Sequence, residues 1–291
     1  MKVQSIKTNV TPEISIRNGI DSKGVDRILG NGKNKMQFIK NKSLTLPKTS
    51  ISKEDLNKII IDNWDYVNDK KIIRSMYFND KKSSDFELYP QKIEQILEKW
   101  YSNFPNETPD WPFRAAGFDQ KVASINRSSM TEEEKDAMLT KQVLKFRWMK
   151  LINTYRNDYI ENKIILMNDN IVPTLGNNRS VDFYIDGIQY DQKVSRGFGG
   201  SFIKNSNKSG EELVQFAKQN SALLARSLYE NQDSQRFDAD YRMYIVFSNE
   251  KENLDLYRYD SQLIIKNLDS LDVNFSYDEV EYETKCRILI L

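Results

Sequence analysis

Two aspartates and a lysine, Asp182, Asp191 and Lys193, are spaced so that they could act together in the stretch from Asn178 to Phe202. The dipeptide Asp186-Gly187 stands between the two acids, and a two-residue type I′ turn favours it because both central residues need a positive φ. The sequence therefore predicts two short antiparallel strands joined by this turn. Two carboxylates and an amine brought together could bind a metal ion and a phosphate.

A two-residue loop also fixes how the strands pair. The predicted pairs are Ile185 with Ile188, Tyr184 with Gln189, Phe183 with Tyr190 and Asp182 with Asp191. Side chains alternate between the two faces of a strand. One face then carries Asp182, Tyr184, Gln189, Asp191 and Lys193, and the other is a core face of Val181, Phe183, Ile185, Ile188 and Tyr190.

The first face is difficult to explain without a cation, because carboxylates directly across a strand pair repel each other at a cost of about 0.2–1 kcal/mol. Mg²⁺ accepts one or two carboxylates together with waters and substrate phosphate. We expect Asp182 and Asp191 to hold Mg²⁺, helped by a backbone carbonyl near Gln192, with Mn²⁺ able to substitute. Lys193 would then face the water or phosphate at the metal. The alternative is an ordinary solvated face of an antiparallel sheet.

A carboxylate followed by Asp-x-Lys on the next strand resembles the PD-(D/E)XK nuclease superfamily, which includes most Type II restriction endonucleases. Carried over, Asp182 matches the first motif acid, Asp191 the second acid and Lys193 the motif lysine. Val181 stands where the family often has proline, and the eight residues between the acids are a tight spacing that the superfamily tolerates. The resemblance covers about residues 135–250.

The resemblance implies a Mg²⁺-dependent endonuclease that hydrolyses phosphodiester bonds of double-stranded DNA and leaves a 5′-phosphate and a 3′-hydroxyl. It also implies a further acid on the helix ahead of the first strand, and Glu161 or Asp158 stands at that place. A homodimer is expected for a palindromic target, because a two-fold site is matched by a two-fold protein.

Basic and polar residues follow the motif in a segment with three glycines, which would suit a mobile loop along a phosphate backbone. The same composition would equally suit a plain flexible connection. The expected DNA contacts are Ser195, Arg196, Lys204 and Lys208.

The elements expected around the hairpin are a helix and a strand before it and a helix and a strand after it. A capping box at Thr131 opens a helix to about Glu161, and the next strand is expected over 164–167. A helix over about 210–231 and a strand over 241–248 follow. This αβββαβ order is that of the PD-(D/E)XK core. The expected fold class is therefore α/β (α+β), with a restriction endonuclease-like core, a mixed central sheet flanked by helices and an N-terminal, largely helical extension.

The division into domains is expected near a segment with three prolines between Phe104 and Phe118. Residues 1–125 would read DNA or form dimer contacts, and residues 126–291 would form the catalytic core. The segment from Gly30 to Lys35 is interpreted as a surface loop, with a phosphate-contacting loop as the alternative.

The amino-acid composition excludes several kinds of catalytic and metal site. Histidine is absent, which excludes Ser-His-Asp triads and histidine zinc sites, and the single Cys286 excludes an intrachain disulfide. Acidic and basic residues nearly cancel, 42 against 43, although a balanced protein can still segregate a basic cleft.

No apolar segment approaches the ~20 residues that cross a bilayer, and the polar N-terminus does not resemble a signal peptide. A cytoplasmic protein without a membrane partner is expected.

Two other classes of function remain open at this point. The same fold could serve as a non-catalytic nucleic-acid-binding or assembly module. The chain could also be a structural or interaction protein whose acids are surface decoration.

Overall fold

The structure, a computed structural model, describes residues 7–46, 51–79, 85–113, 117–176, 181–230, 241–249, 254–265, 267–277 and 279–291. The contacts within the chain divide it into two compact units. The first contains residues 1–84, 161–253 and 258–291, and the second contains residues 85–160 and 254–257. Residues 1–84 thus group with the residues that carry the motif, which differs from the expected division at residue 125.

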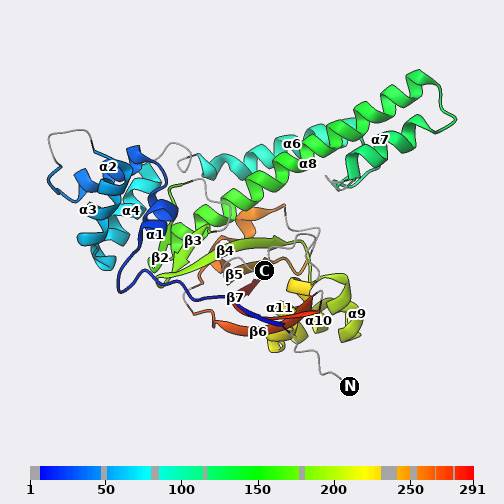
Figure 1. Ribbon diagram of the computed structural model, residues 1–291. Coiled ribbons are helices and arrows are strands. Elements are labelled where there is room, and N and C mark those ends of the chain that lie inside the picture. Colours follow the sequence, from blue (N-terminus) through cyan, green and yellow to red (C-terminus); the bar gives the residue numbers. More distant parts are fainter. Residues whose placement is uncertain are drawn as a thin grey trace. The chain divides into compact units, whose positions relative to one another are not determined.

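A mixed sheet of seven strands, counted over the described residues, lies at the centre of the first unit (Figure 1). The strands are β1 (Lys7–Val10), β2 (Ile171–Pro173), β3 (Phe183–Ile185), β4 (Ile188–Ser195), β5 (Tyr241–Val246), β6 (Leu271–Tyr277) and β7 (Val280–Ile290). Their order is β1-β7-β5-β4-β3-β2, and β6 pairs with β7. The pairs β2–β3, β3–β4 and β6–β7 are antiparallel, whereas β4–β5, β5–β7 and β1–β7 are parallel. The expected mixed α/β class is confirmed.

The helices around the motif follow the expected order of elements. Helix α8 (Glu132–Met167) precedes β2, and α9 (Gly200–Ser206), α10 (Gly210–Gln219) and α11 (Ser221–Glu230) separate β4 from β5. The strand expected over 164–167 is wrong, because these residues are the last turn of α8 and the first strand is β2. The single helix expected over 210–231 is two helices, since Asn220 leaves helical geometry at φ −124° and ψ 44° and its amide donates to the Phe216 carbonyl.

The described residues of the N-terminal part of the first unit form the helices α1 (Ser22–Leu29), α2 (Gly32–Asn41), α3 (Lys53–Asp62) and α4 (Tyr66–Asn79). Ser52 and Asp55 form the expected capping box of α3. The loop expected from Gly30 to Lys35 is wrong from Gly32 onward, because the Asn31 side chain caps α2 by accepting the N–H of Asn34. Apolar side chains of these helices pack with Val172 of β2 and Tyr184 of β3 in one core.

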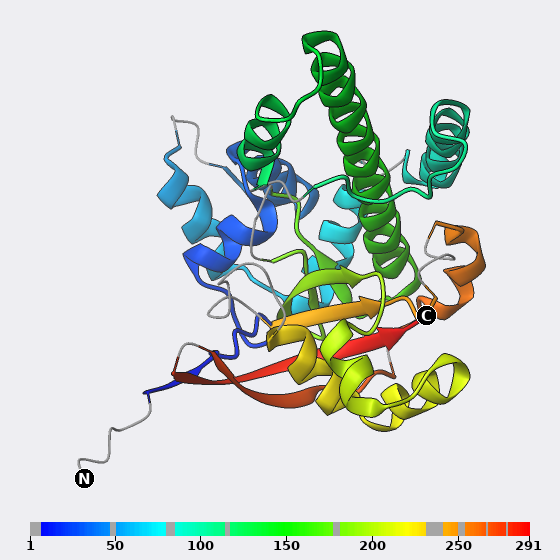
Figure 2. The same cartoon turned by 90° about the vertical axis from the view of Figure 1, so that its right-hand side faces the viewer.

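A second core lies at the other strands of the sheet. It joins α9, α10 and α11 to β5, β6 and β7, and Figure 2 shows these helices beside β6 and β7. Tyr229 of α11 stacks on Phe275 of β6 with ring centroids 5.0 Å apart. Such aromatic pairs add to the free energy that burial alone contributes. The sheet is therefore packed by two helical groups, one near the β2 edge and one near β6.

The second unit is helical in its described part. It contains α6 (Tyr89–Asn103), α7 (Phe118–Asn126) and most of α8. Trp100 of α6 contacts Trp148 of α8 with ring centroids 6.2 Å apart, and Phe113 stacks on Phe146 at 4.9 Å. Aromatic packing along α8 thus holds this unit together. Among the described helices of the chain, none combines the length and the apolar composition needed to span a membrane.

Candidate active site

The tight turn between β3 and β4 adopts the predicted geometry. Asp186 and Gly187 both have positive φ, 54° and 84°. The pairs of Ile185 with Ile188, Tyr184 with Gln189 and Phe183 with Tyr190 are confirmed. A Cβ on Gly187 would lie 2.6 Å from Cγ of Arg17, so both φ and space require glycine there.

The strand pairing changes at the first acid. Asp182 stands just before β3, and its N–H donates to the carbonyl oxygen of Tyr190 at 3.0 Å, so it does not form the expected regular pair with Asp191. On its other side, Thr174 donates to the Asp182 carbonyl through its N–H at 3.2 Å and through its hydroxyl at 3.1 Å. The backbone of Asp182 is therefore held between β4 and the residue that follows β2.

The side chains of the motif meet across β3 and β4. One carboxylate oxygen of Asp182 accepts the backbone N–H of Gln192 at 2.6 Å. The Lys193 ammonium lies 2.8 and 2.7 Å from the two carboxylate oxygens of Asp191. The structure thus brings together the two acids and the lysine that the sequence singles out.

The two acids influence each other's protonation. Burial, the charge of Asp191 and a side-chain hydrogen bond with Asp191 raise the pKa of Asp182 to about 6, against the opposing effects of the Gln192 N–H and Lys193. When both acids are ionised, two carboxylates share one ammonium, and one negative charge stays uncompensated within the trio. A bound cation would remove this cost.

The face that carries the acids is buried. Asp191 is only 7% exposed, and Tyr184 and Gln189 of the same predicted face are also buried. Gln189 accepts a 2.8 Å hydrogen bond from Arg27 of α1. The alternative of an ordinary solvated sheet face is wrong for Asp191, because this residue is buried on β4, an inner strand that pairs with both β3 and β5.

The further acid does not join the two aspartates. Glu161 is half-buried on α8, and among the residues that the structure describes no three acids, histidines or cysteines gather to hold a metal ion. Asp158, whose pKa is raised by burial, belongs to the second unit. The acid pair alone provides carboxylate ligands, which is a set that Mg²⁺ accepts when water and phosphate complete its coordination.

The residues expected to contact DNA follow directly after β4. The Ser195 hydroxyl donates to the carbonyl of Gly197 at 2.6 Å and so helps to shape the bend. Arg196 is half-buried, and Lys204 is exposed on α9. The Lys208 ammonium lies 3.9 Å from Glu212 and 6.0 Å from the ring centre of Phe216. DNA contact by these four residues stays a prediction.

Sequence reasoning missed the groups that orient the site. The N–H groups of Gln192 and Thr174 belong to the backbone, so no residue type or spacing marks their role. The Thr174 hydroxyl binds the carbonyl of Asp182, a contact that joins segments on either side of residues 177–180. Tyr244 of β5 pairs in register with Lys193, and burial is the main cause that raises its pKa, with a smaller contribution from the charge of Asp191. The parallel pairing of β4 with β5, which places Tyr244 there, has no local sequence signal.

Comparison of the chain with protein-family models, with curated proteins and with solved structures finds no match. Any assignment of function therefore depends on the site itself and on the order of elements around it.

Proposed function

We propose that this chain is a Mg²⁺-dependent endonuclease of the restriction type that hydrolyses phosphodiester bonds of DNA. The observation that carries the proposal is the pair of Asp182, half-buried just before β3, and Asp191, buried on β4, with Lys193 bound to the second acid. The order of elements supports it, because α8, β2, β3, β4, the helices α9 to α11 and β5 follow the αβββαβ succession of a PD-(D/E)XK core. Double-stranded DNA and a homodimer belong to the same proposal.

The residues present fit a divalent cation. Asp182 and Asp191 would hold it, with the backbone carbonyl of Gln192 as a further oxygen ligand. Burial raises the pKa of Asp182 most and the charge of Asp191 adds to it, so the ionised pair is unfavourable without more positive charge nearby. When bound, the cation supplies charge neutralisation at the phosphate and lowers the pKa of a water molecule.

Lys193 is the more exposed partner of its ion pair with Asp191. Its side chain is 40% exposed, whereas the Asp191 side chain is 10% exposed, so the ammonium can swing away from a fixed carboxylate. On Asp191 it compensates part of the negative charge of the acid pair. Turned toward a bound phosphate, the same ammonium would orient the attacking water and stabilise negative charge on the phosphate oxygens.

Asp182 is held in place by its neighbours. The Gln192 N–H fixes its carboxylate, and Thr174 fixes its backbone. A ligand that is oriented before the cation arrives loses less conformational entropy on binding. Without histidine in the chain, the proton of the attacking water must pass to a carboxylate, to lysine or to solvent.

The test is incubation of plasmid and long phage DNA with Mg²⁺ and the wild-type protein, Asp182→Asn or Lys193→Ala. Each variant is expected to lose cleavage by at least ~100-fold because it removes a ligand or the charge at the phosphate. Both are expected to retain DNA binding. Discrete bands from the wild type would indicate a sequence-specific enzyme, and a smear a non-specific one.

Matched controls are Asp62→Asn and Lys58→Ala, which remove the same groups from an exposed ion pair on α3. They should cleave as the wild type does. Undiminished cutting by both site variants, or no cutting by the wild type with Mg²⁺ or Mn²⁺, would overturn the proposal.

A further inference from the structure

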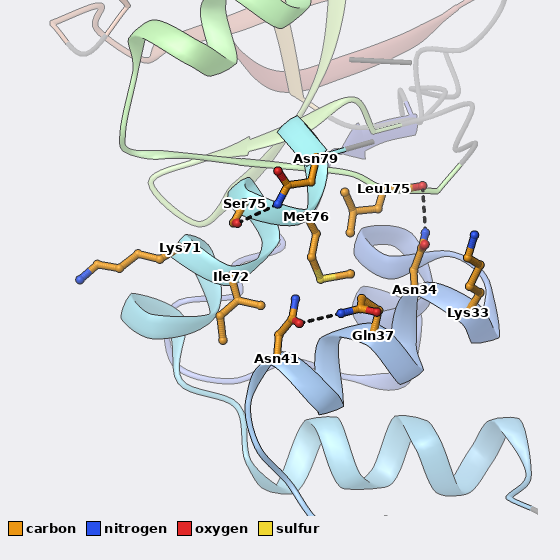
Figure 3. A pocket seen from close by; sticks show the side chains of 10 residues that line it. All are labelled: Lys33, Asn34, Gln37, Asn41, Lys71, Ile72, Ser75, Met76, Asn79 and Leu175. Atoms are coloured by element: carbon orange, nitrogen blue, oxygen red, sulfur yellow. Dashed lines mark hydrogen bonds between the residues drawn. The ribbon is translucent and has the colours of Figure 1, made fainter. Parts of the chain in front are cut away.

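A polar groove of about 830 Å³ lies between α2 and α4 in the first unit (Figure 3). Its floor contains the apolar side chains of Ile72 and Met76. Among the residues that the structure describes, its polar lining contains lysine, amide and hydroxyl groups and no carboxylate. These residues are Lys33, Asn34, Gln37, Asn41, Lys71, Ser75 and Asn79. The described lining of the groove thus carries positive and neutral polar groups, which favours a polyanion.

Positive charge is concentrated along α2. The segment from Gly30 to Leu46 contains no acidic residue. Two lysines of this segment form ion pairs with acids that lie outside it. Lys35 pairs with Asp26, and the Lys42 ammonium lies 2.6 Å from the carboxylate of Asp69. The helix therefore keeps an excess of positive charge although the whole chain is nearly neutral.

The other lysines at the groove and beside it form no ion pair within the described part of the chain. Lys33 and Lys40 of α2 and Lys71 of α4 are exposed, and none has an acidic partner among the residues that the structure describes. Lys33 and Lys71 stand at opposite ends of the groove (Figure 3). A second hollow of about 530 Å³ shares Lys33 with the groove and extends along α2 to Lys40. The positive charge thus follows an elongated surface, which suits an extended polyanion.

The amide groups between the lysines retain hydrogen-bonding capacity. The Gln37 amide donates to the Asn41 side-chain carbonyl at 2.7 Å, and the Asn79 amide donates to the Ser75 hydroxyl at 3.3 Å. The Asn41 amide nitrogen and the Asn79 carbonyl oxygen are on exposed side chains at the groove. Amides of this kind bind phosphate and sugar oxygens and, in a DNA groove, the edges of bases.

The wall of the groove is joined to the acid pair. Leu175 lines the groove, and its carbonyl accepts a hydrogen bond from Asn34 of α2 at 3.3 Å. The preceding residue, Thr174, donates to the carbonyl of Asp182. Gly30 and Gly176 pack backbone to backbone, since a Cβ on Gly30 would lie 2.6 Å from Cα of Gly176. The groove is therefore anchored to the segment that positions the first acid.

We infer that the groove between α2 and α4 binds the backbone of double-stranded DNA, with Lys33 and Lys71 on phosphates and the amides between them on the sugar-phosphate backbone or on base edges. The inference rests on the proposed function, which makes DNA the partner. It assigns DNA binding, rather than dimer contacts, to this part of the N-terminal region.

The test measures binding and not cleavage. Fluorescence anisotropy of a fluorescein-labelled mixed-sequence duplex, with EDTA present, is followed for the wild type and for Lys33→Ala/Lys71→Ala over a range of salt concentrations. Each lost phosphate contact is expected to raise Kd by ~10-fold near 0.1 M salt, and the loss of both should reduce the slope of log K against log salt by about 2. The matched control Lys23→Ala/Lys218→Ala removes two exposed lysines from α1 and α10 and should keep the wild-type slope.

A second variant places a negative charge inside the groove without changing side-chain shape. Gln37→Glu is expected to weaken binding, and Gln219→Glu, an exposed position on α10, is expected not to. Thermal melts by circular dichroism check that the variants fold. Equal Kd and slope for the groove variant and its control, or no binding by the wild type, would overturn the inference.

Cleavage of plasmid DNA with Mg²⁺, measured in parallel, separates this inference from the proposed function. A wild type that cleaves, together with groove variants that bind as their controls do, would contradict the groove and leave the nuclease. Binding that depends on Lys33 and Lys71 in a protein that never cleaves would support the groove and contradict the nuclease.

Discussion

The backbone N–H of Gln192 donates a 2.6 Å hydrogen bond to the carboxylate of Asp182. The donor stands on β4 between Asp191 and Lys193, so the strand that carries the second acid also fixes the first. Asp182 cannot turn away from Asp191 without losing a charge-assisted hydrogen bond. The repulsion between the two carboxylates is therefore built into the fold, and the following predictions depend on it.

Asp182→Asn should stabilise the protein at neutral pH when no metal is present. Asparagine keeps an oxygen that accepts the Gln192 N–H and removes the charge next to Asp191. The pKa of about 6 in the folded state lies above the ordinary value of 3.8, so the folded state binds the proton more tightly than the unfolded chain. Ionisation of Asp182 then costs stability, a cost that grows between about pH 4 and pH 6 and reaches roughly 2–3 kcal/mol above that range.

Urea unfolding of the wild type and the variant with EDTA, at several pH values, measures this difference. The gain should be largest above pH 6 and should vanish near pH 4. Asp62→Asn, an exposed position, should show no such dependence. A variant that is less stable than the wild type at pH 7.5 would contradict the built-in repulsion.

Divalent cations should stabilise the wild type through both acids. Mg²⁺ or Mn²⁺ at 100 times its Kd is expected to add about 2.7 kcal/mol to the free energy of unfolding, since the ion binds the folded state. Asp191→Asn removes one of the two carboxylates and should lose most of this effect. Thermal melts with and without the ion provide the measurement. An equal rise in Tm for the wild type and Asp191→Asn would indicate a metal site elsewhere.

Lys193→Ala should separate chemistry from metal binding. The variant loses the charge that would act at the phosphate, and cleavage is expected to fall by ~10²–10⁴-fold. Mn²⁺ affinity, measured by calorimetry, should stay the same or increase, because the ammonium no longer competes for the oxygens of Asp191. Lys58→Ala is the control. A variant that loses metal affinity together with activity would show that Lys193 has only a structural role.

Gly187→Ala should destabilise the hairpin that presents the acids. The residue has φ 84°, and a Cβ there would lie 2.6 Å from Cγ of Arg17. The expected loss is about 1–3 kcal/mol of unfolding free energy. Gly200→Ala, at the first residue of α9 with no atom within contact of a Cβ, should be neutral or slightly stabilising. Chemical unfolding compares the two, and an equal effect would contradict the strain at the turn.

The hairpin could be predicted from the sequence because its turn is a local signal. Asp186-Gly187 sets both φ values, and the turn then determines the pairs from Ile185 with Ile188 outward. The predicted register holds from this turn to the pair of Phe183 with Tyr190, which brings the two acids next to each other. The expected pair of Asp182 with Asp191 is wrong, because the Asp182 N–H donates to the Tyr190 carbonyl. The Asp182 carbonyl is also bound by Thr174, which follows β2 and has no local signal in the hairpin sequence.

The N-terminal helices show where sequence patterns were insufficient. Gly30 and Gly32 around Asn31 favoured a loop, yet Asn31 caps α2 and Gly30 allows a close approach to Gly176. Lys35 and Asp69 are buried charges. Lys35 is paired with Asp26 of α1, and Asp69 with Lys42, the residue that follows α2. Such pairs between distant segments, like the parallel pairing of β4 with β5, depend on the tertiary fold and not on local periodicity.

The most direct test of the acid pair as a cation site is anomalous scattering from crystals of the wild-type protein soaked in Mn²⁺. We expect a peak between the carboxylates of Asp182 and Asp191, and its loss in Asp191→Asn. Well-ordered carboxylates without any anomalous peak between them would contradict it.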